Sequence, residues 1–518
     1  LIFILCLPNG MSHCIHRYLM ALVFLSVSSA VLMSQPWYVS TTGSDSNTGT
    51  LSSPFRTIEK AVSVVKTGET IYVRGGTYNL TATITLGKSG AENSRISLLA
   101  YPGETPVLDF TAQALSGSNR GIVLTGNWWH IKGLGITGAG DNGMLISGGS
   151  NNLIEQCSFW RNRDSGLQID NGASDNFIRN CDSYFNADPP DYGDADGFAP
   201  KLTVGSGNHF YGCRAWRNCD DGWDGYLRGA NDVTTTLEYC WTFGNGYFED
   251  GTDAGENANG NGFKMGGSDD KTLMHNFILK NCLAFGNKAK GFDQNNNKGS
   301  MTLYNCTGHG NLVDNYRITQ ALEPGKILTL KNCAELGGRV SIGSFAVQEK
   351  NSWLPPFVVT SADFRSTDPA GATGSRKSDG SLPHMEYLHL AVGSDLIDAG
   401  VNLGLPFAGT APDLGCFETG LTAAADAPLA GKTLIYPNPV ATTGYIRFNA
   451  PTGGRCEIRL FDATGNRVAT LASLQVEPGE NTVRLDLSNI RNGIYICELK
   501  INSERVFVGR LVRTDIPD

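Results

Sequence analysis

The sequence predicts an all-β protein whose main domain is a solenoid of stacked parallel coils, followed by a small β-sandwich. Two observations favour the solenoid: a short cysteine-containing motif recurs through the middle of the chain, and 63 of the 518 residues are glycine. A fixed internal repeat is the signature of stacked architectures, and frequent glycine suits their many tight turns. The third observation is a C-terminal stretch in which apolar and polar residues alternate, as in half-buried strands.

The first 34 residues are expected to be a signal peptide. Arg17 provides a positive start, residues 19–32 form an apolar run, and small residues near the end of this run mark a cleavage site. Residues 1–10 precede Met11 and are interpreted as a mis-called start. Because no second long apolar stretch follows, we expect an exported protein without a membrane span.

Both ends of the predicted solenoid have recognisable flanking segments. Trp37–Tyr78 resembles the opening cap of many bacterial parallel β-helix proteins, and Arg56–Lys66 within it predicts a short amphipathic helix. Such a cover is needed because a free strand edge pairs with other chains. Asn351–Glu418 resembles the closing segment of the same proteins, so the solenoid domain is assigned to residues 35–420.

Seven copies of the recurring motif, such as NLIEQCSFWRN and NFIRNCDSYFN, are spaced by 24 to 42 residues. The cysteines are Cys157, Cys181, Cys213, Cys240, Cys282, Cys306 and Cys333, and the first six are each followed by an asparagine, Asn162, Asn186, Asn218, Asn245, Asn287 and Asn311. Stacked coils place equivalent residues about 4.8 Å apart, so these asparagines can hydrogen-bond along the axis. Thirteen cysteines in an exported chain would ordinarily indicate disulfides. Their placement instead predicts a reduced, buried ladder.

A short step with a central glycine follows each of five ladder asparagines, and aligning these steps gathers acidic residues on one side of the solenoid. One row holds Asp196 and Asp221, the other holds Asp224, Lys264 and Asp293, and Asp220 lies beside Asp221. Carboxylates that lie close together repel one another unless a cation joins them. Ligand sets made only of oxygen suit Ca²⁺. The alternative is a set of ordinary solvated turn residues, since Asp before Gly is common in turns.

Four motifs between Cys181 and Asn315, DADGFAPK, NCDDGWDGY, NGFKMGG and KGFDQNN, resemble polysaccharide lyase family 9, whose members are pectate lyases. The resemblance implies a right-handed parallel β-helix, an acidic polysaccharide substrate (polygalacturonate or pectin) and a Ca²⁺ cofactor. It also implies that Asp196, Asp220, Asp221 and Asp224 are the calcium ligands and that Lys264 is the catalytic base. The long stretch Gly246–Gly260 is expected to border the cleft.

The implied chemistry is consistent with these residue types. β-Elimination from a uronate requires removal of the C5 proton, and a cation on the adjacent carboxylate acidifies that proton. The base must be neutral, although a free lysine titrates near a pH of about 10.4; a nearby divalent cation lowers this pKa. Alkaline activity is therefore expected. Lys264 could instead be structural, paired with Asp224 or Asp293.

Other roles remain open at this level. Lys201, Arg228, Lys298 and Arg317 are candidates for binding substrate carboxylates and equally for surface charges. A polygalacturonase-like glycoside hydrolase could use the Asp220–Asp221 pair, and a non-enzymatic surface protein could bind polysaccharide on the same fold. The net charge of −9 makes nucleic acid an unlikely general partner, and a monomer is expected.

The C-terminal region is divided into an Ala-rich linker, 421–433, and a β-sandwich, 434–518. The sandwich resembles the sorting domain of the type IX secretion system, including Pro437-Asn438-Pro439 and Gly493-Ile494-Tyr495. The resemblance implies the secretion machinery as a partner and an extracellular protein, either released or attached to the cell surface. A carbohydrate-binding or adhesion sandwich is the alternative.

Overall fold

The computed structural model describes residues 36–420, except 93, and residues 434–513, except 437–439, 441, 451–452, 463–465, 477–478 and 503. The predicted signal peptide, the predicted linker and the Pro437-Asn438-Pro439 element lie outside the described residues. No helix in the described part of the chain has the length and apolar composition that a membrane span requires.

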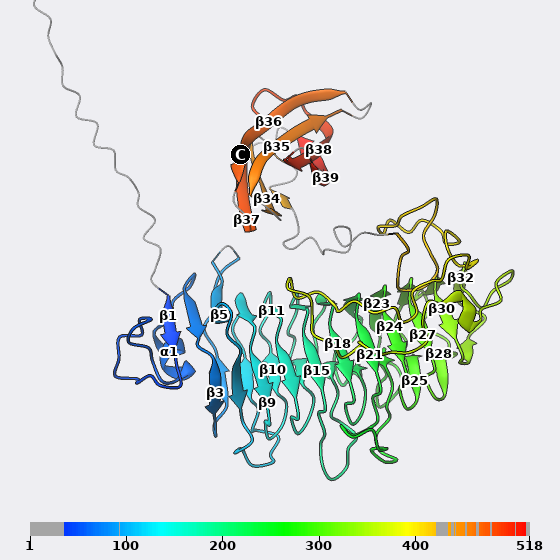
Figure 1. Ribbon diagram of the computed structural model, residues 1–518, viewed down its shortest axis with the longest axis horizontal. Helices are drawn as coiled ribbons and strands as arrows, with labels where there is room; N and C mark the ends of the chain where they lie inside the picture. Colours follow the sequence, from blue (N-terminus) through cyan, green and yellow to red (C-terminus); the bar gives the residue numbers. More distant parts are fainter. Residues whose placement is uncertain are drawn as a thin grey trace, which may run out of the picture.

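Residues 36–349 form a right-handed parallel β-helix in which a full coil contributes one strand to each of three long sheets (Figure 1). Sheet 1 contains β1 (Trp37–Val39), β2 (Thr70–Val73), β5 (Ile96–Ala100), β8 (Trp129–Lys132), β11 (Leu153–Glu155), β14 (Phe177–Arg179), β17 (Asn208–Tyr211), β20 (Val233–Glu238), β23 (His275–Lys280), β26 (Met301–Tyr304), β29 (Leu328–Lys331) and β32 (Val347–Glu349). Sheet 2 contains β4 (Ile84–Leu86), β7 (Ile122–Leu124), β10 (Met144–Ser147), β13 (Leu167–Asp170), β16 (Phe198–Pro200), β19 (Trp223–Asp224), β22 (Phe263–Lys264), β25 (Lys290–Asp293), β28 (Asp314–Ile318) and β31 (Val340–Ile342). Sheet 3 contains β3 (Gly76–Asn79), β6 (Pro106–Asp109), β9 (Gly135–Thr137), β12 (Ser158–Trp160), β15 (Asp182–Tyr184), β18 (Arg214–Trp216), β21 (Trp241–Phe243), β24 (Leu283–Phe285), β27 (Thr307–His309) and β30 (Ala334–Leu336). The predicted fold class is confirmed.

The predicted asparagine ladder runs along the inside of the coils. The amide nitrogen of each asparagine donates to the amide oxygen of the asparagine one coil further on, at 2.8–3.0 Å, from Asn162 to Asn311. The seven ladder cysteines are buried free thiols, as expected. A second ladder, Asn152 to Asn176 to Asn208, was not predicted. These rows satisfy polar groups that would be costly to bury alone.

Aromatic rings fill the core behind sheet 2. Phe198, Trp223, Phe263, Phe292 and Tyr316 stack one coil above another, with ring centroids 4.7–5.3 Å apart. All five are almost completely buried. Because side chains alternate between the two faces of a strand, the residues beside these rings face outward in equally regular rows.

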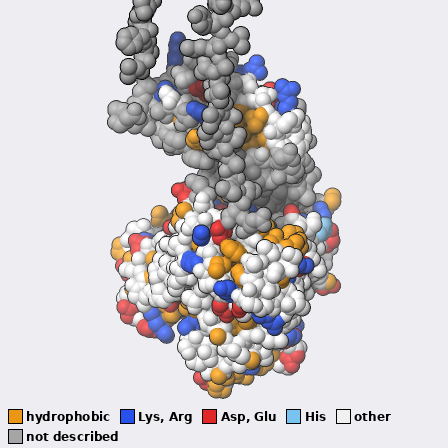
Figure 2. Space-filling model, turned by 90° about the vertical axis from the view of Figure 1, so that its left-hand side faces the viewer, with side chains coloured by type: hydrophobic (Ala, Val, Ile, Leu, Met, Phe, Trp, Pro, Cys, Tyr) orange, Lys and Arg blue, Asp and Glu red, His pale blue; other side chains and the backbone are white. Residues whose placement is uncertain are grey.

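The N-terminal end of the solenoid is covered by α1 (Ile58–Val64), which is shorter than the predicted helix Arg56–Lys66. The helix begins at Ile58 and not at Arg56, because Thr57 is its N-cap. The Thr57 hydroxyl accepts a hydrogen bond from the Lys60 amide. Ile58, Ala61 and Val62 are buried against the first coils. Seen from this end, acidic and basic side chains are interspersed with small apolar patches (Figure 2).

Residues 351–420 form an irregular segment with one 3-10 turn, η1 (Ser361–Asp363), that returns along the outside of sheet 3. A buried ion cluster ties it down: Asp182 binds Arg214 and Arg376 at 2.8 and 2.6 Å. Arg214 also donates to the carbonyls of Ala372 and Gly374. The segment therefore covers aromatic side chains on the outer face of sheet 3, which include Trp216, Phe243 and Phe285.

The C-terminal domain consists of two antiparallel sheets, as predicted. One contains β33 (Leu434–Tyr436), β34 (Thr443–Ala450) and β37 (Gly479–Asp486); the other contains β35 (Gly454–Phe461), β36 (Arg467–Val476), β38 (Gly493–Ile501) and β39 (Glu504–Arg513). Their inner faces bury a separate apolar core that includes Phe448, Ile458 and Leu499.

The asparagine ladder can be tested with Asn218→Ala. The change leaves the amides of Asn186 and Asn245 each short of a partner, and a buried polar group without a partner costs about 1–3 kcal/mol. We expect the free energy of unfolding to fall by about 2–4 kcal/mol in urea denaturation followed by circular dichroism. Asn257→Ala, at an exposed position, is the control. Equal stabilities of the two variants would contradict a stabilising ladder.

Candidate active site

The register of sheet 2 places the acidic steps over one another, as the alignment predicted. Trp223 pairs with Phe263, so Asp224 lies directly beside Lys264 on the next coil, and Lys264 lies beside Asp293. The strand before them is aligned through Phe198 and Trp223. Both predicted rows are therefore present on the outer face of the sheet.

The five predicted site residues meet on the coils of β16, β19 and β22, where Asp196, Asp220 and Asp221 form one carboxylate group and Asp224 joins it through Lys264. Carboxylate oxygens of Asp196, Asp220 and Asp221 lie within 4.8 Å of one another. The Lys264 amine nitrogen is 3.0 Å from Asp221 Oδ2, 3.3 Å from Asp224 Oδ1 and 4.0 Å from Asp220 Oδ2. Each carboxylate is at most 5 % exposed. The alternative of four solvated turn acids is therefore wrong.

Lys201 is a member of the cluster that the sequence left undecided. Its amine nitrogen lies 2.8 Å from Asp196 Oδ2 and 3.7 Å from Asp224 Oδ2, and its side chain is buried. It follows the end of β16, outside the aligned steps, and so no row contained it. The other three candidate cations lie apart from the carboxylates: Arg228 pairs with Asp269, Arg317 pairs with Asp314, and Lys298 donates to a carbonyl.

Backbone and side-chain amides of the long stretch after β21 orient two of the carboxylates. Asp221 Oδ1 accepts hydrogen bonds from the backbone and side chain of Asn261 at 2.6 and 2.9 Å. Asp220 Oδ1 accepts one from the Asn259 amide at 2.6 Å. Asn259 thus brings the stretch Gly246–Gly260 to the edge of the acidic cluster, and its expected place beside a substrate cleft stays a prediction.

His275 supports the end of β19 from within the core. It is fully buried, and its Nδ1 and Nε2 lie 2.8 Å from the Gly225 carbonyl and the Thr235 hydroxyl. Burial lowers the pKa of His275 to about 4, so the ring is neutral. An imidazole that donates to the Gly225 carbonyl fixes the backbone immediately after Asp224.

The two lysines are held in their charged form. Burial opposes the charge on Lys264, but the carboxylates of Asp221 and Asp224 outweigh it and raise the pKa well above its ordinary value. The pKa of Lys201 is raised by Asp196 and Asp224 against the same effect of burial. In the protein alone, both amines are therefore ammonium groups at neutral pH.

The carboxyl groups respond differently to their positions. Burial and repulsion from neighbouring carboxylates raise the pKa of Asp196 and of Asp220 well above the usual range. The pKa of Asp224 is lowered, because the ammonium groups of Lys264 and Lys201 outweigh its burial. When all four carboxyl groups are ionised, they face two ammonium groups, so two negative charges have no counter-charge within the cluster. A bound divalent cation would neutralise these two charges.

Comparisons with known proteins identify the family of the chain. Residues 37–332 match the family described as Pel9A-like, right handed beta helix region, and residues 434–512 match the secretion system C-terminal sorting domain. Pectate lyase L of Dickeya chrysanthemi is 38 % identical over 405 residues, which are 76 % of this chain and 92 % of that protein. Pectate lyase L of Paenibacillus polymyxa is 41 % identical over 374 residues, 67 % of this chain and 80 % of that protein.

Solved structures give the same result. The crystal structure of pectate lyase Pel9A is 38 % identical, with a TM-score of 0.69 over 74 % of this chain and 96 % of that one. A rhamnogalacturonan lyase is 27 % identical, with a TM-score of 0.61 over 70 % and 98 % of the two chains. The sorting-domain match indicates a secreted protein. The chain thus belongs to the Pel9A-like right-handed β-helix family and is a polysaccharide lyase with a C-terminal secretion-sorting domain.

Proposed function

We propose that this protein is a calcium-dependent pectate lyase that cleaves polygalacturonate by β-elimination, with Lys264 as the base. The observation that carries the proposal is the position of the Lys264 amine, 3.0–4.0 Å from three carboxylates on the neighbouring coil. A cation held by those carboxylates and a base beside it are the two groups that proton removal next to a uronate carboxylate requires.

The carboxylates fit Ca²⁺ in three respects. The donor set contains only oxygen atoms, as this ion prefers. Asp221 Oδ2 is buried and accepts no well-directed hydrogen bond, although the Lys264 ammonium lies near it. The fully ionised cluster also has an excess of two negative charges, which a divalent cation would balance. Asp196, Asp220, Asp221 and Asp224 would hold the ion, which supplies charge stabilisation for the carbanion-like state next to the substrate carboxylate.

Lys264 moves the proton in this scheme. Its neutral amine accepts the proton from C5, the C4–O4 bond breaks, and a C4–C5 double bond forms while O4 leaves and takes a proton from water. The surrounding carboxylates raise the pKa of Lys264, so the neutral amine becomes more abundant only as the pH rises. The rate should therefore increase toward alkaline pH.

The hydrolase alternative fits the geometry poorly. An inverting glycosidase separates its two carboxyl groups by about 6.5–9.5 Å to leave space for water. Here the Asp220 and Asp221 oxygens lie within 4.8 Å of one another, and the Lys264 ammonium lies against both side chains. The Lys264 ammonium already contacts both carboxylates, which supports a lyase over a hydrolase.

We further propose that the C-terminal domain directs the protein through its secretion machinery and can leave it attached to the cell surface. The separate core of this domain supports a role independent of the solenoid. Its match to a sorting domain supports export over carbohydrate binding.

Removal of calcium tests the metal. Chelation should abolish formation of the unsaturated product, measured by its near-ultraviolet absorbance on polygalacturonate. Added Ca²⁺ should restore activity, whereas Mg²⁺ should not, because Mg²⁺ demands a tighter octahedral set of ligands. Asp221→Asn should weaken calcium binding with little loss of fold. Full turnover in excess chelator would contradict the calcium assignment.

Lys264 is tested by comparing Lys264→Ala with Lys264→Arg. Removing a positioned base should lower turnover by about 10²–10⁴-fold while calcium and oligogalacturonate binding persist. Arginine should be nearly as damaging, because a guanidinium stays protonated and cannot accept the proton. An arginine variant with near-wild-type turnover would instead show that Lys264 is an ion-pair partner only.

Deletion of residues 434–518 separates sorting from catalysis. The shortened protein should retain the turnover of the full chain on polygalacturonate in a cell lysate, but it should no longer be found outside the producing cell. Activity in the medium and in the cell fraction is the measurement. Loss of turnover with unchanged export would favour a substrate-binding role for this domain.

A further inference from the structure

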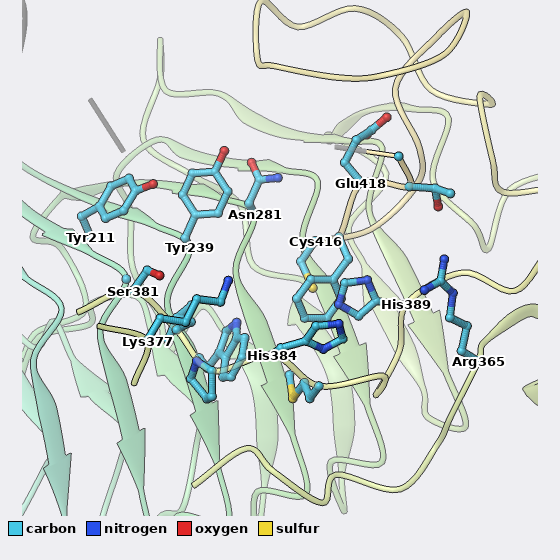
Figure 3. Close-up of a pocket in the computed structure, with 18 residues that line it drawn as sticks. Tyr211, Tyr239, Asn281, Arg365, Lys377, Ser381, His384, His389, Cys416 and Glu418 are labelled. Carbon is cyan, nitrogen blue, oxygen red and sulfur yellow. The ribbon is translucent and has the colours of Figure 1, made fainter. Parts of the chain in front are cut away.

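A second cavity lies on a different side of the solenoid from the acidic cluster. It has a volume of about 440 Å³ and lies between the end of sheet 1, the start of sheet 3 and the returning C-terminal segment (Figure 3). Tyr211, Tyr239 and Asn281 line it from the coils, and Lys377 and His384 line it from the segment. The acidic cluster belongs to sheet 2, so the two sites share no residue.

The cavity combines aromatic surfaces with polar groups. The rings of Tyr211 and Tyr239 lie 5.2 Å apart, and Trp241 forms a buried wall. His389 stacks on Phe417 at 4.1 Å. Burial, with a contribution from Arg365, lowers the pKa of His389 to about 4, so this ring is neutral and can exchange hydrogen bonds with hydroxyl groups.

One buried polar group in the wall lacks a partner. Asn281 is 7 % exposed, and its amide oxygen accepts no hydrogen bond from any residue that the structure describes. This oxygen has almost no accessible surface, and the equivalent oxygens of Asn180 and Asn305 on other coils also lack a partner, so it is a feature of the repeat and not a contact for a ligand.

The rim of the cavity is cationic. The Lys377 ammonium is exposed and forms no ion pair or hydrogen bond with the described residues. Arg365 is partly compensated by Glu386, 3.3 Å away. The Glu418 carboxylate is turned to its own segment, where it accepts from the amides of Ala408 and Asp413. Asp379 offsets the Lys377 charge only through space, so an anionic ligand would meet Lys377 as the less compensated of the two cations.

We propose that this cavity is a second carbohydrate site, which binds a short uronic-acid oligosaccharide away from the site of cleavage. Aromatic rings suit the apolar faces of sugars, the neutral His389 ring exchanges hydrogen bonds with hydroxyl groups, and Lys377 binds a carboxylate. The volume lies within the range of about 300–1,000 Å³ found for small-ligand pockets. The choice of a uronate as ligand rests on the proposed function.

The test is a calorimetric titration of full-length Lys264→Ala protein with trigalacturonate in excess chelator, so that the acidic cluster holds no calcium. Binding is expected, and adding Lys377→Met should weaken it by about tenfold, which corresponds to about 1.4 kcal/mol, because the variant loses a charged hydrogen-bond donor to the ligand carboxylate. Tyr239→Asn removes the ring, and asparagine tolerates the positive φ of 55° at that position. It should weaken binding too. Lys66→Met, at an exposed position in the N-terminal cap region, is the matched control and should change nothing.

Three outcomes would overturn the proposal: no binding at all, binding that Lys377→Met and Tyr239→Asn leave unchanged, or binding that disappears with Asp221→Asn. Equal binding of the fully methyl-esterified trimer would overturn the choice of an acidic ligand. Turnover of the single Lys377→Met variant on polygalacturonate should equal that of the wild type. An active enzyme without Lys377-dependent binding would refute the second site alone, and Lys377-dependent binding without unsaturated product would refute the lyase proposal alone.

Discussion

Parallel strands one coil apart must pair residue for residue, because every backbone group of a central strand bonds to the coil above or below it. In this chain that register brings like residues together along the whole solenoid. Asparagine meets asparagine at 2.8–3.0 Å, and ring meets ring at 4.7–5.3 Å. For amides and aromatic rings such stacking is favourable, because each can satisfy or cover its own kind.

The same register is unfavourable for carboxylates. Asp196 and Asp221 share a row, so the backbone that stabilises the solenoid also holds their charges together in a buried place. The chain offsets the repulsion in part by placing Lys201 and Lys264 against them. The raised pKa values of Asp196 and Asp220 show that this compensation is incomplete in the protein alone. A bound divalent cation, as proposed, would relieve the repulsion between these carboxylates, and its binding would stabilise the folded protein.

Much of the fold could be predicted because the same residue types recur at equivalent positions of successive coils. The spacing of cysteine and asparagine indicated the stacking, and the glycine steps then placed Asp224 beside Lys264, as the structure has it. Lys201 could not be placed in this way, since it lies beyond the aligned step and reaches the cluster through its side chain. The second cavity was also hidden, because Tyr239 and Lys377 are far apart in sequence and meet only through the tertiary path of the closing segment. That path depends on Asp182 and its two arginines, which no local pattern connects.

The site coincides with the least regular part of the ladder. Most asparagine steps span 24 to 32 residues, but the step from Asn245 to Asn287 spans 42, and the preceding coil ends in Asp220 and Asp221. The extra residues do not disturb the stack, because the strands before and after them, β21 and β22, pair with the neighbouring coils and the excess chain loops outward. The excess chain helps to orient the carboxylates: Asn259 within it holds Asp220, and Asn261 immediately after it holds Asp221. A solenoid can therefore acquire a reactive site by lengthening one connection, while the repeat on either side maintains the distances that the chemistry needs.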